Sequence, residues 1–143
     1  MRGIRSADKL RIEKVLDTLT ELVDYSSRGV PILVEGRKDE DALKGLGVTG
    51  RIIRVSQPGK RLFEIAEELR SCETVVILTD FDQEGEKLAK ELSRHLHSWG
   101  VQTILRNKVR NAVTWASRQI EGLTKIEGLR EHLNNKQFII NSA

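Results

Sequence analysis

A chain of 143 residues, of which 38% are hydrophobic and 31% charged, has the size and composition of one folded domain. The content of only 2 prolines argues against disorder, and the single cysteine excludes an internal disulfide. The longest strongly apolar run, Val75–Leu78, is far shorter than the roughly 18 to 20 residues that cross a bilayer, so we expect no membrane span. Because no apolar leader follows Met1, we also expect a cytoplasmic protein.

The net charge of +3 is small, so the distribution of charge is more informative than its sum. Acids gather at Asp39–Asp41 and again from Asp80 to Glu86, and basic residues gather in two segments, 51–61 and 106–110. This pattern fits an acidic, cation-binding centre flanked by basic segments. Solvated charged faces explain either basic cluster equally well.

The first half of the chain alternates between helical and strand-like patterns. Apolar residues at three- and four-residue steps predict an amphipathic helix over about 6–28, which Gly29 would end. The apolar run at 31–34 predicts a buried strand that stops at Glu35-Gly36. A short helix around 42–46 and a second strand at 51–55 follow.

The same alternation continues to residue 105. We predict a helix over 62–69, a strand at 74–79, a helix over 88–99 and a strand at 101–105. This order indicates an α/β, Rossmann-like fold with a mainly parallel sheet of about four strands and helices on both faces. A further helical region over 110–134 would complete a single domain, 1–143, around a core of about 30–110.

Two acidic segments follow apolar strands of this predicted sheet. Glu35 ends the strand at 31–34, and Asp80 begins an acidic segment where the strand at 74–79 ends. Open α/β sheets bind ligands outside the carboxyl ends of their strands, especially between neighbours whose crossovers leave to opposite faces. If the two strands are neighbours, these carboxylates converge. In extended chain Asp80 and Asp82 also point the same way, so the pair can hold one ion.

Clustered carboxylates need compensation. Each pair within a few ångström repels by roughly 1 to 4 kcal/mol at effective dielectric constants of 80 to 20. Protonation or a hard cation can offset that repulsion. Oxygen ligands without a nearby Cys or His favour Mg²⁺, with Mn²⁺ as a substitute, over Zn²⁺. We therefore predict a Mg²⁺ site that would also bind phosphate oxygens of a substrate.

These motifs and their order resemble the Toprim domain over about residues 30–110. The matching features are Glu35-Gly36 after an apolar strand, Asp39 four residues beyond the Glu, and Asp80-Phe81-Asp82 after a second apolar strand. Toprim domains occur in type IA topoisomerases, bacterial-type primases, recombination mediators and several nucleases, including the small ribonucleases that mature 5S ribosomal RNA. The resemblance implies the Toprim version of the Rossmann-like fold.

The resemblance also implies roles for individual residues. Glu35 would be the general acid/base, and a set of acids would bind metal: Asp80, Asp82, Glu84 as a third contributor and, for a second ion, Asp39. Arg37 and Lys38 adjoin these acids in the chain, so we expect at least one of them to contact a phosphate.

Departures from the larger relatives narrow the expected activity. Topoisomerases of this group place Pro and Arg where Phe81 and Gln83 stand, and they need a tyrosine nucleophile on further domains. The only tyrosine here, Tyr25, lies on the first predicted helix. Priming would need zinc-binding and helicase-interacting partners. We therefore expect a small Mg²⁺-dependent nuclease or related phosphoryl-transfer enzyme acting on RNA or DNA, with a homodimer or a larger nucleic-acid-processing complex as its assembled form.

Other interpretations of the same residues remain open. The acids from Asp80 to Glu91 match an EF-hand calcium loop in part, although they follow a strand and place Lys87 where an apolar residue is usual. An Asp-x-Asp phosphatase would leave the Glu35 motif unexplained. A phosphate-accepting receiver needs a lysine after its last strand, which Lys108 matches only loosely. The acids could also simply cap helices. A non-catalytic module that binds nucleic acid or a partner protein is the alternative function.

Overall fold

The computed structural model describes residues 6–79 and 82–104 of the 143-residue chain. In these residues helices and strands alternate in the order α1 (Ser6–Ser27), β1 (Ile32–Val34), α2 (Arg37–Gly45), β2 (Ile52–Arg54), α3 (Leu62–Glu67), β3 (Thr74–Leu78), α4 (Gln83–Ser98) and β4 (Gln102–Ile104). Every helix and strand predicted before residue 105 is therefore present. The helical region predicted over 110–134 lies outside the described residues, as do the basic segment 106–110 and Lys108.

The four strands form one sheet in the order β2-β1-β3-β4, and each neighbouring pair is parallel. Leu33 in the middle of β1 pairs with Ile53 of β2 on one side and with Ile77 of β3 on the other. The predicted α/β class with a parallel sheet is confirmed. Because parallel strands run in one direction, their carboxyl ends share one edge of the sheet, and the loops that leave this edge are brought together.

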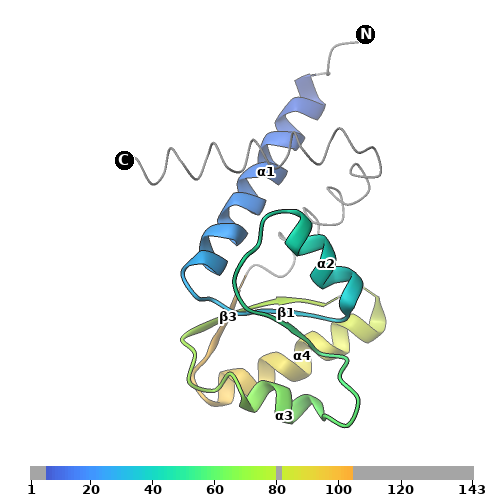
Figure 1. Cartoon of the computed structure of the whole chain (residues 1–143), viewed down its shortest axis with the longest axis vertical. Helices are drawn as coiled ribbons and strands as arrows, with labels where there is room; N and C mark the ends of the chain where they lie inside the picture. Colours follow the sequence, from blue (N-terminus) through green and yellow to red (C-terminus); the bar gives the residue numbers. More distant parts are fainter. Residues whose placement is uncertain (1–5, 80–81, 105–143) are drawn as a thin grey trace.

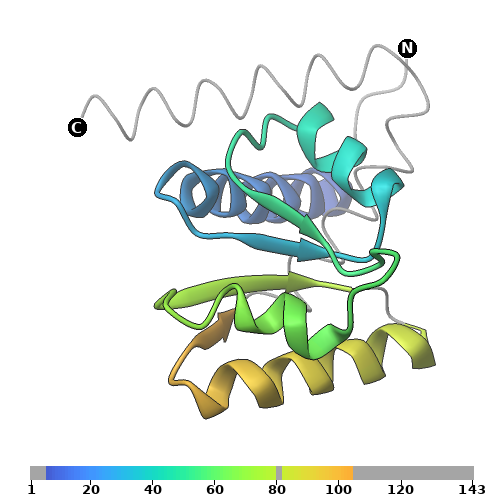
Figure 2. The same cartoon turned by 60° about the horizontal axis from the view of Figure 1, so that its bottom comes forward.

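Helices cover both faces of the sheet, with α1 and α2 on one face and α3 and α4 on the other (Figures 1 and 2). Side chains of β1 alternate between the two layers: Ile32 and Val34 pack in the core beneath α1 and α2, and Leu33 packs in the core beneath α3 and α4. Both faces are therefore buried. This explains why the strand sequences are continuous apolar runs and do not alternate with polar residues.

The loop that enters β2 is held against the end of α1. Gly29 follows α1 with a φ of 88°, a left-handed conformation that favours glycine and ends the helix as predicted. The N–H of Gly50 donates to the hydroxyl oxygen of Ser26, a buried residue, at 2.9 Å. A Cβ at position 50 would lie 2.4 Å from the same oxygen. Glycine is therefore required for this close approach of the loop to α1.

The connections from β1 and β3 leave the sheet toward opposite faces. The chain passes from β1 into α2 on one side and from β3 into α4 on the other, and β1 and β3 are neighbours. In open α/β sheets such a pair marks the topological switch point, outside whose carboxyl ends ligands bind. The fold therefore selects the ends of β1 and β3 as the place to look for a functional site.

The helices also decide two questions raised by the sequence. Because α4 begins at Gln83, most of the stretch that spaces its acids like an EF-hand loop is helical, and the calcium-loop interpretation is wrong. Within residues 6–79 and 82–104, no helix has the length and apolar character needed to span a membrane.

Candidate metal and phosphate site

The residues that lead into the two acidic segments lie side by side at the carboxyl edge of the sheet. Val34 of β1 pairs with Leu78 of β3, so the next residues, Glu35 and Thr79, occupy neighbouring positions in the same register. β1 and β3 are therefore neighbours, which is the condition for Glu35 and Asp82 to lie close together. Asp80, the first predicted metal ligand, lies outside the described residues.

Glu35 stands on a fixed backbone. Its carbonyl oxygen accepts the N–H of Ser56 at 3.0 Å, which extends the hydrogen bonding between β1 and β2 by one residue. The residue is partly exposed. At Gly36, φ is −150°, an extended conformation open to any residue, and an added Cβ would meet no described atom within 4 Å. In the described part of the chain, space is therefore left open beside Glu35.

Asp39, Arg37 and Lys38 occupy the first turn of α2. Oδ2 of Asp39 accepts the N–H of Gly36 at 3.3 Å, so this acid helps to cap the helix. Arg37 and Lys38 are exposed, and Nε of Arg37 lies 4.0 Å from Oδ2 of Asp41 in a largely solvated pair. Such pairs contribute only about 0 to 1 kcal/mol. The Arg37 side chain can therefore leave its partner for a phosphate at small cost.

Asp82 is the N-cap of α4. Its Oδ1 accepts the N–H of Gly85 at 2.7 Å, and the positive end of the helix dipole favours its negative charge. The cap uses one carboxylate oxygen, and the second oxygen of a carboxylate can bind a cation at the same time. The interpretation of Asp82 as a helix cap is therefore confirmed, and it is compatible with metal binding.

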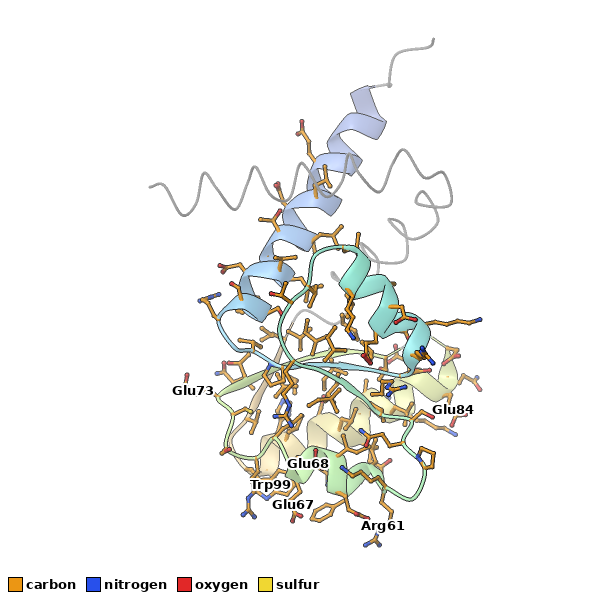
Figure 3. All side chains as sticks on the ribbon, viewed as in Figure 1. Arg61, Glu67, Glu68, Glu73, Glu84 and Trp99 are labelled. Atoms are coloured by element: carbon orange, nitrogen blue, oxygen red, sulfur yellow. The ribbon has the colours of Figure 1, made fainter. Side chains whose placement is uncertain are left out.

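Glu84 lies in the first turn of α4, exposed, at the end of the sheet where that helix begins (Figure 3). Glu73, which precedes β3, lies at the opposite end (Figure 3). Acids in a first turn are favoured by the helix dipole even without a cation. Glu84 thus has a local role in α4 and is also placed on the side of the molecule where Asp82 and Glu35 lie.

The donor atoms at this edge fit a hard cation. The candidate residues are carboxylates, whereas Cys72 precedes β3, and His95 and His97 lie in the last turn of α4, toward the other edge. Within residues 6–79 and 82–104, which exclude Asp80, no three His, Cys, Asp or Glu side chains are grouped closely enough to hold a metal ion. Mg²⁺ usually keeps several waters and uses one or two protein carboxylates. The described residues are compatible with such a sparsely held ion.

Sequence reasoning missed the role of Thr79. Its side chain is fully buried, with 0% exposure, and its hydroxyl donates to the carbonyl oxygen of Gly85 at 2.8 Å. Thr79 therefore links the end of β3 to the first turn of α4, next to Asp82. The available signal was a hydroxyl residue that directly follows the apolar run Val75–Leu78, because a buried hydroxyl needs a hydrogen-bond partner.

Comparisons with known proteins agree with this architecture. The family model described as the Toprim domain matches residues 30–114. A UPF0292 protein of Methanosarcina barkeri is 38% identical over 124 residues, covering 84% of this chain and 85% of its own, and one of Thermococcus sibiricus is 37% identical over 130 residues, covering 90% and 94%. A solved structure of an Aquifex aeolicus protein aligns with a TM-score of 0.56 at 30% identity, covering 69% of this chain and 87% of that one.

This chain therefore belongs to the Toprim domain family and is a relative of the UPF0292 proteins. The predicted resemblance and the predicted Rossmann-like fold are both confirmed. Toprim domains typically bind Mg²⁺ through acidic residues and act on nucleic acids. The extent of the single domain, 1–143 with a core of about 30–110, stays a prediction.

Proposed function

We propose that this protein is a Mg²⁺-dependent nuclease that hydrolyses phosphodiester bonds in RNA or DNA. One observation carries the proposal: β1 and β3 are neighbours with crossovers on opposite faces, so Glu35 and the acidic start of α4 leave the same switch point. A carboxylate for proton transfer beside carboxylates for a cation is the arrangement that phosphodiester hydrolysis needs.

The acids divide between two tasks. In the proposed site Asp80 and Asp82 bind Mg²⁺, Glu84 contributes a third acidic group, and Asp39 is the weaker candidate ligand of a second ion. When bound, the ion orients the phosphate and offsets the negative charge that develops on its oxygens. The N–H of Gly85 holds Asp82 by one oxygen, so little side-chain entropy remains to be lost when a cation arrives.

In the proposed mechanism Glu35 transfers the proton. As a general base its carboxylate takes a proton from the attacking water, whose oxygen forms a bond to phosphorus while the bond from phosphorus to the leaving oxygen breaks. As a general acid it returns that proton to the leaving oxygen. Its backbone is fixed by the bond from Ser56, and the residue is partly exposed, so water can reach this edge.

Arg37 and Lys38 would bind phosphates that flank the scissile bond. Both lie in the first turn of α2, directly after the Glu35-Gly36 turn, and both are exposed. Positive side chains together with the N–H groups of a helix start favour an anion. We further propose that RNA or DNA is the partner and that the protein works in the cytoplasm, as a homodimer or within a larger nucleic-acid-processing complex.

The test is cleavage of a panel of structured RNA and DNA substrates with Mg²⁺ or Mn²⁺. Glu35→Gln should lower cleavage by at least about 100-fold, since general acid/base residues contribute roughly 10² to 10⁴ in rate. Mn²⁺ binding and thermal stability should stay at the wild-type level because Glu35 is not a proposed ligand. The matched control is Glu73→Gln, which removes the same charge at the opposite edge of the sheet and should leave cleavage unchanged.

Equal cleavage by wild type and Glu35→Gln would contradict the catalytic role. The other candidate function, a non-catalytic module that binds nucleic acid, draws support from the cap bonds of Asp39 and Asp82, which give both acids a structural use. Salt-dependent binding without turnover on any substrate would favour that module over the nuclease.

A further inference from the structure

Gly85, in the first turn of α4, is held through both of its backbone polar groups. Its carbonyl oxygen accepts the hydroxyl of Thr79 at 2.8 Å, and its N–H donates to Oδ1 of Asp82 at 2.7 Å. These two bonds make a continuous connection from the end of β3, through the helix start, to the Asp82 carboxylate. A hydrogen-bonded connection through Gly85 therefore runs from the Thr79 hydroxyl to the Asp82 carboxylate.

Thr79 is suited to anchor this connection because it is buried at the end of an inner strand of the sheet. It directly follows β3, a strand with neighbours on both sides, and its own exposure is 0%. Gly85 is buried as well. A hydrogen bond in such a setting is shielded from competing water. If the Thr79 hydroxyl is removed, solvent therefore does not readily replace it as a partner of the Gly85 carbonyl.

We propose that Thr79 is a positioning residue for the cation site and that its hydroxyl sets the metal affinity of Asp82 through Gly85. The inference rests on the proposed function of Asp82 as a metal ligand. Groups that orient a ligand from behind commonly change metal affinity by about 10- to 100-fold when they are removed. Because Thr79 acts through one intervening residue, we expect the lower end of this range.

The experiment measures Mn²⁺ and Mg²⁺ binding to the full chain by calorimetry, with no nucleic acid present. Thr79→Val keeps the shape of the side chain and removes the hydroxyl, so the dissociation constant should rise about tenfold. Thr79→Ser keeps the hydroxyl and should bind within about twofold of wild type. Rescue by serine separates a hydrogen bond from a loss of packing.

Thr20→Val is the matched control. Thr20 is also buried, and its hydroxyl donates to a backbone carbonyl oxygen, that of Leu16, at 2.8 Å within α1. The same substitution there removes a similar bond on an element that supplies none of the candidate site residues. It should reduce stability and leave the metal dissociation constant unchanged. An equal loss of affinity in Thr20→Val would reduce the effect at Thr79 to general destabilisation and overturn the proposal.

The remaining outcomes are also decisive. Wild-type affinity in Thr79→Val overturns the positioning role and leaves the proposed nuclease standing. If wild-type protein binds neither ion, the proposed metal site fails and the positioning role fails with it. If Thr79→Val does not fold, Thr79→Ser and Thr79→Ala replace it, since both lack the methyl group and differ only in the hydroxyl. Equal affinities of that pair would overturn the proposal.

Discussion

The β1–α2 and β3–α4 turns are built on the same plan but differ in how firmly they hold their acids. In both turns a strand ends, the chain turns, and an acid accepts a backbone N–H at the start of the following helix: Asp39 from within α2 and Asp82 as the N-cap of α4. Asp39 accepts the N–H of Gly36 at 3.3 Å, whereas Asp82 accepts the N–H of Gly85 at 2.7 Å. The β3–α4 turn has an additional anchor in the buried hydroxyl of Thr79.

The two turns also differ in the charged residues that they carry. The first turn of α2 carries two basic residues, Arg37 and Lys38, both exposed, and two acids, Asp39 and Glu40. The charged residues in the first turn of α4 are both acids, Glu84 and Glu86, and they follow the Asp82 cap. A hard metal cation is bound best by carboxylates held in place, whereas a long polyanion can be bound by basic side chains that keep their conformational freedom. This difference supports the proposed division, in which the β3–α4 turn binds the ion and the β1–α2 turn contacts the nucleic acid.

The largest effect should come from the cap of the β3–α4 turn. Asp82→Asn keeps an N-cap acceptor and removes the charge, so metal affinity should fall by about 100-fold, which corresponds to about 2.7 kcal/mol, while stability stays near wild type. Asp82→Ala should lose the same affinity and also about 1 kcal/mol of stability. Calorimetry with Mn²⁺ and urea unfolding measure the two quantities. If both variants bind Mn²⁺ normally, Asp82 is a cap alone and the division between the turns disappears.

An intermediate effect is expected for the cations of the β1–α2 turn. Arg37→Ala with Lys38→Ala should weaken nucleic-acid binding and reduce the slope of log affinity against log salt by about 1 to 2, because up to two phosphate contacts are lost. Fluorescence anisotropy with a labelled oligonucleotide at several salt concentrations measures this slope.

The control for the cation pair is Arg28→Ala with Arg70→Ala. Both double variants lower the formal net charge of +3 by two. Arg28 and Arg70 are also exposed, but they precede β1 and β3, at the amino edge of the sheet. Arg28 matches Arg37 further, since it pairs with an acid four positions away, with its nitrogen 3.0 Å from Oδ2 of Asp24. An equal change of slope in this control would show that total charge matters and that the turn does not.

The smallest effect should come from Asp39→Ala. The bond to Gly36 is long, so the free energy of unfolding should fall by only about 0.5 kcal/mol, less than for Asp82→Ala. Urea unfolding measured side by side ranks the two caps, and the reverse ranking would contradict the difference in anchoring. The number of Mn²⁺ ions bound per chain tests its proposed second role: a loss of one ion would identify Asp39 as a ligand in a second site, and an unchanged number would leave the bond to Gly36 as its role.

Much of this fold follows from local pattern. The apolar runs at 31–34 and 74–79 become buried strands because their residues suit two packed faces, and the spacing of apolar residues between them suits helices. Gly29 ends α1 as predicted because it can adopt a left-handed conformation. Glu35 also lies directly after β1, as its position in the chain requires.

The sequence by itself therefore determined the order of elements, the α/β class and the residues that stand at the ends of strands, because these depend on periodicity and residue type within short stretches. Only the tertiary structure decided that β1 lies beside β3, that their crossovers leave to opposite faces, and that Thr79 bonds to Gly85 behind Asp82. Strand order depends on how whole layers pack, and the bond from Thr79 depends on the angle at which α4 leaves β3. Neither quantity is encoded in the pattern of any single segment.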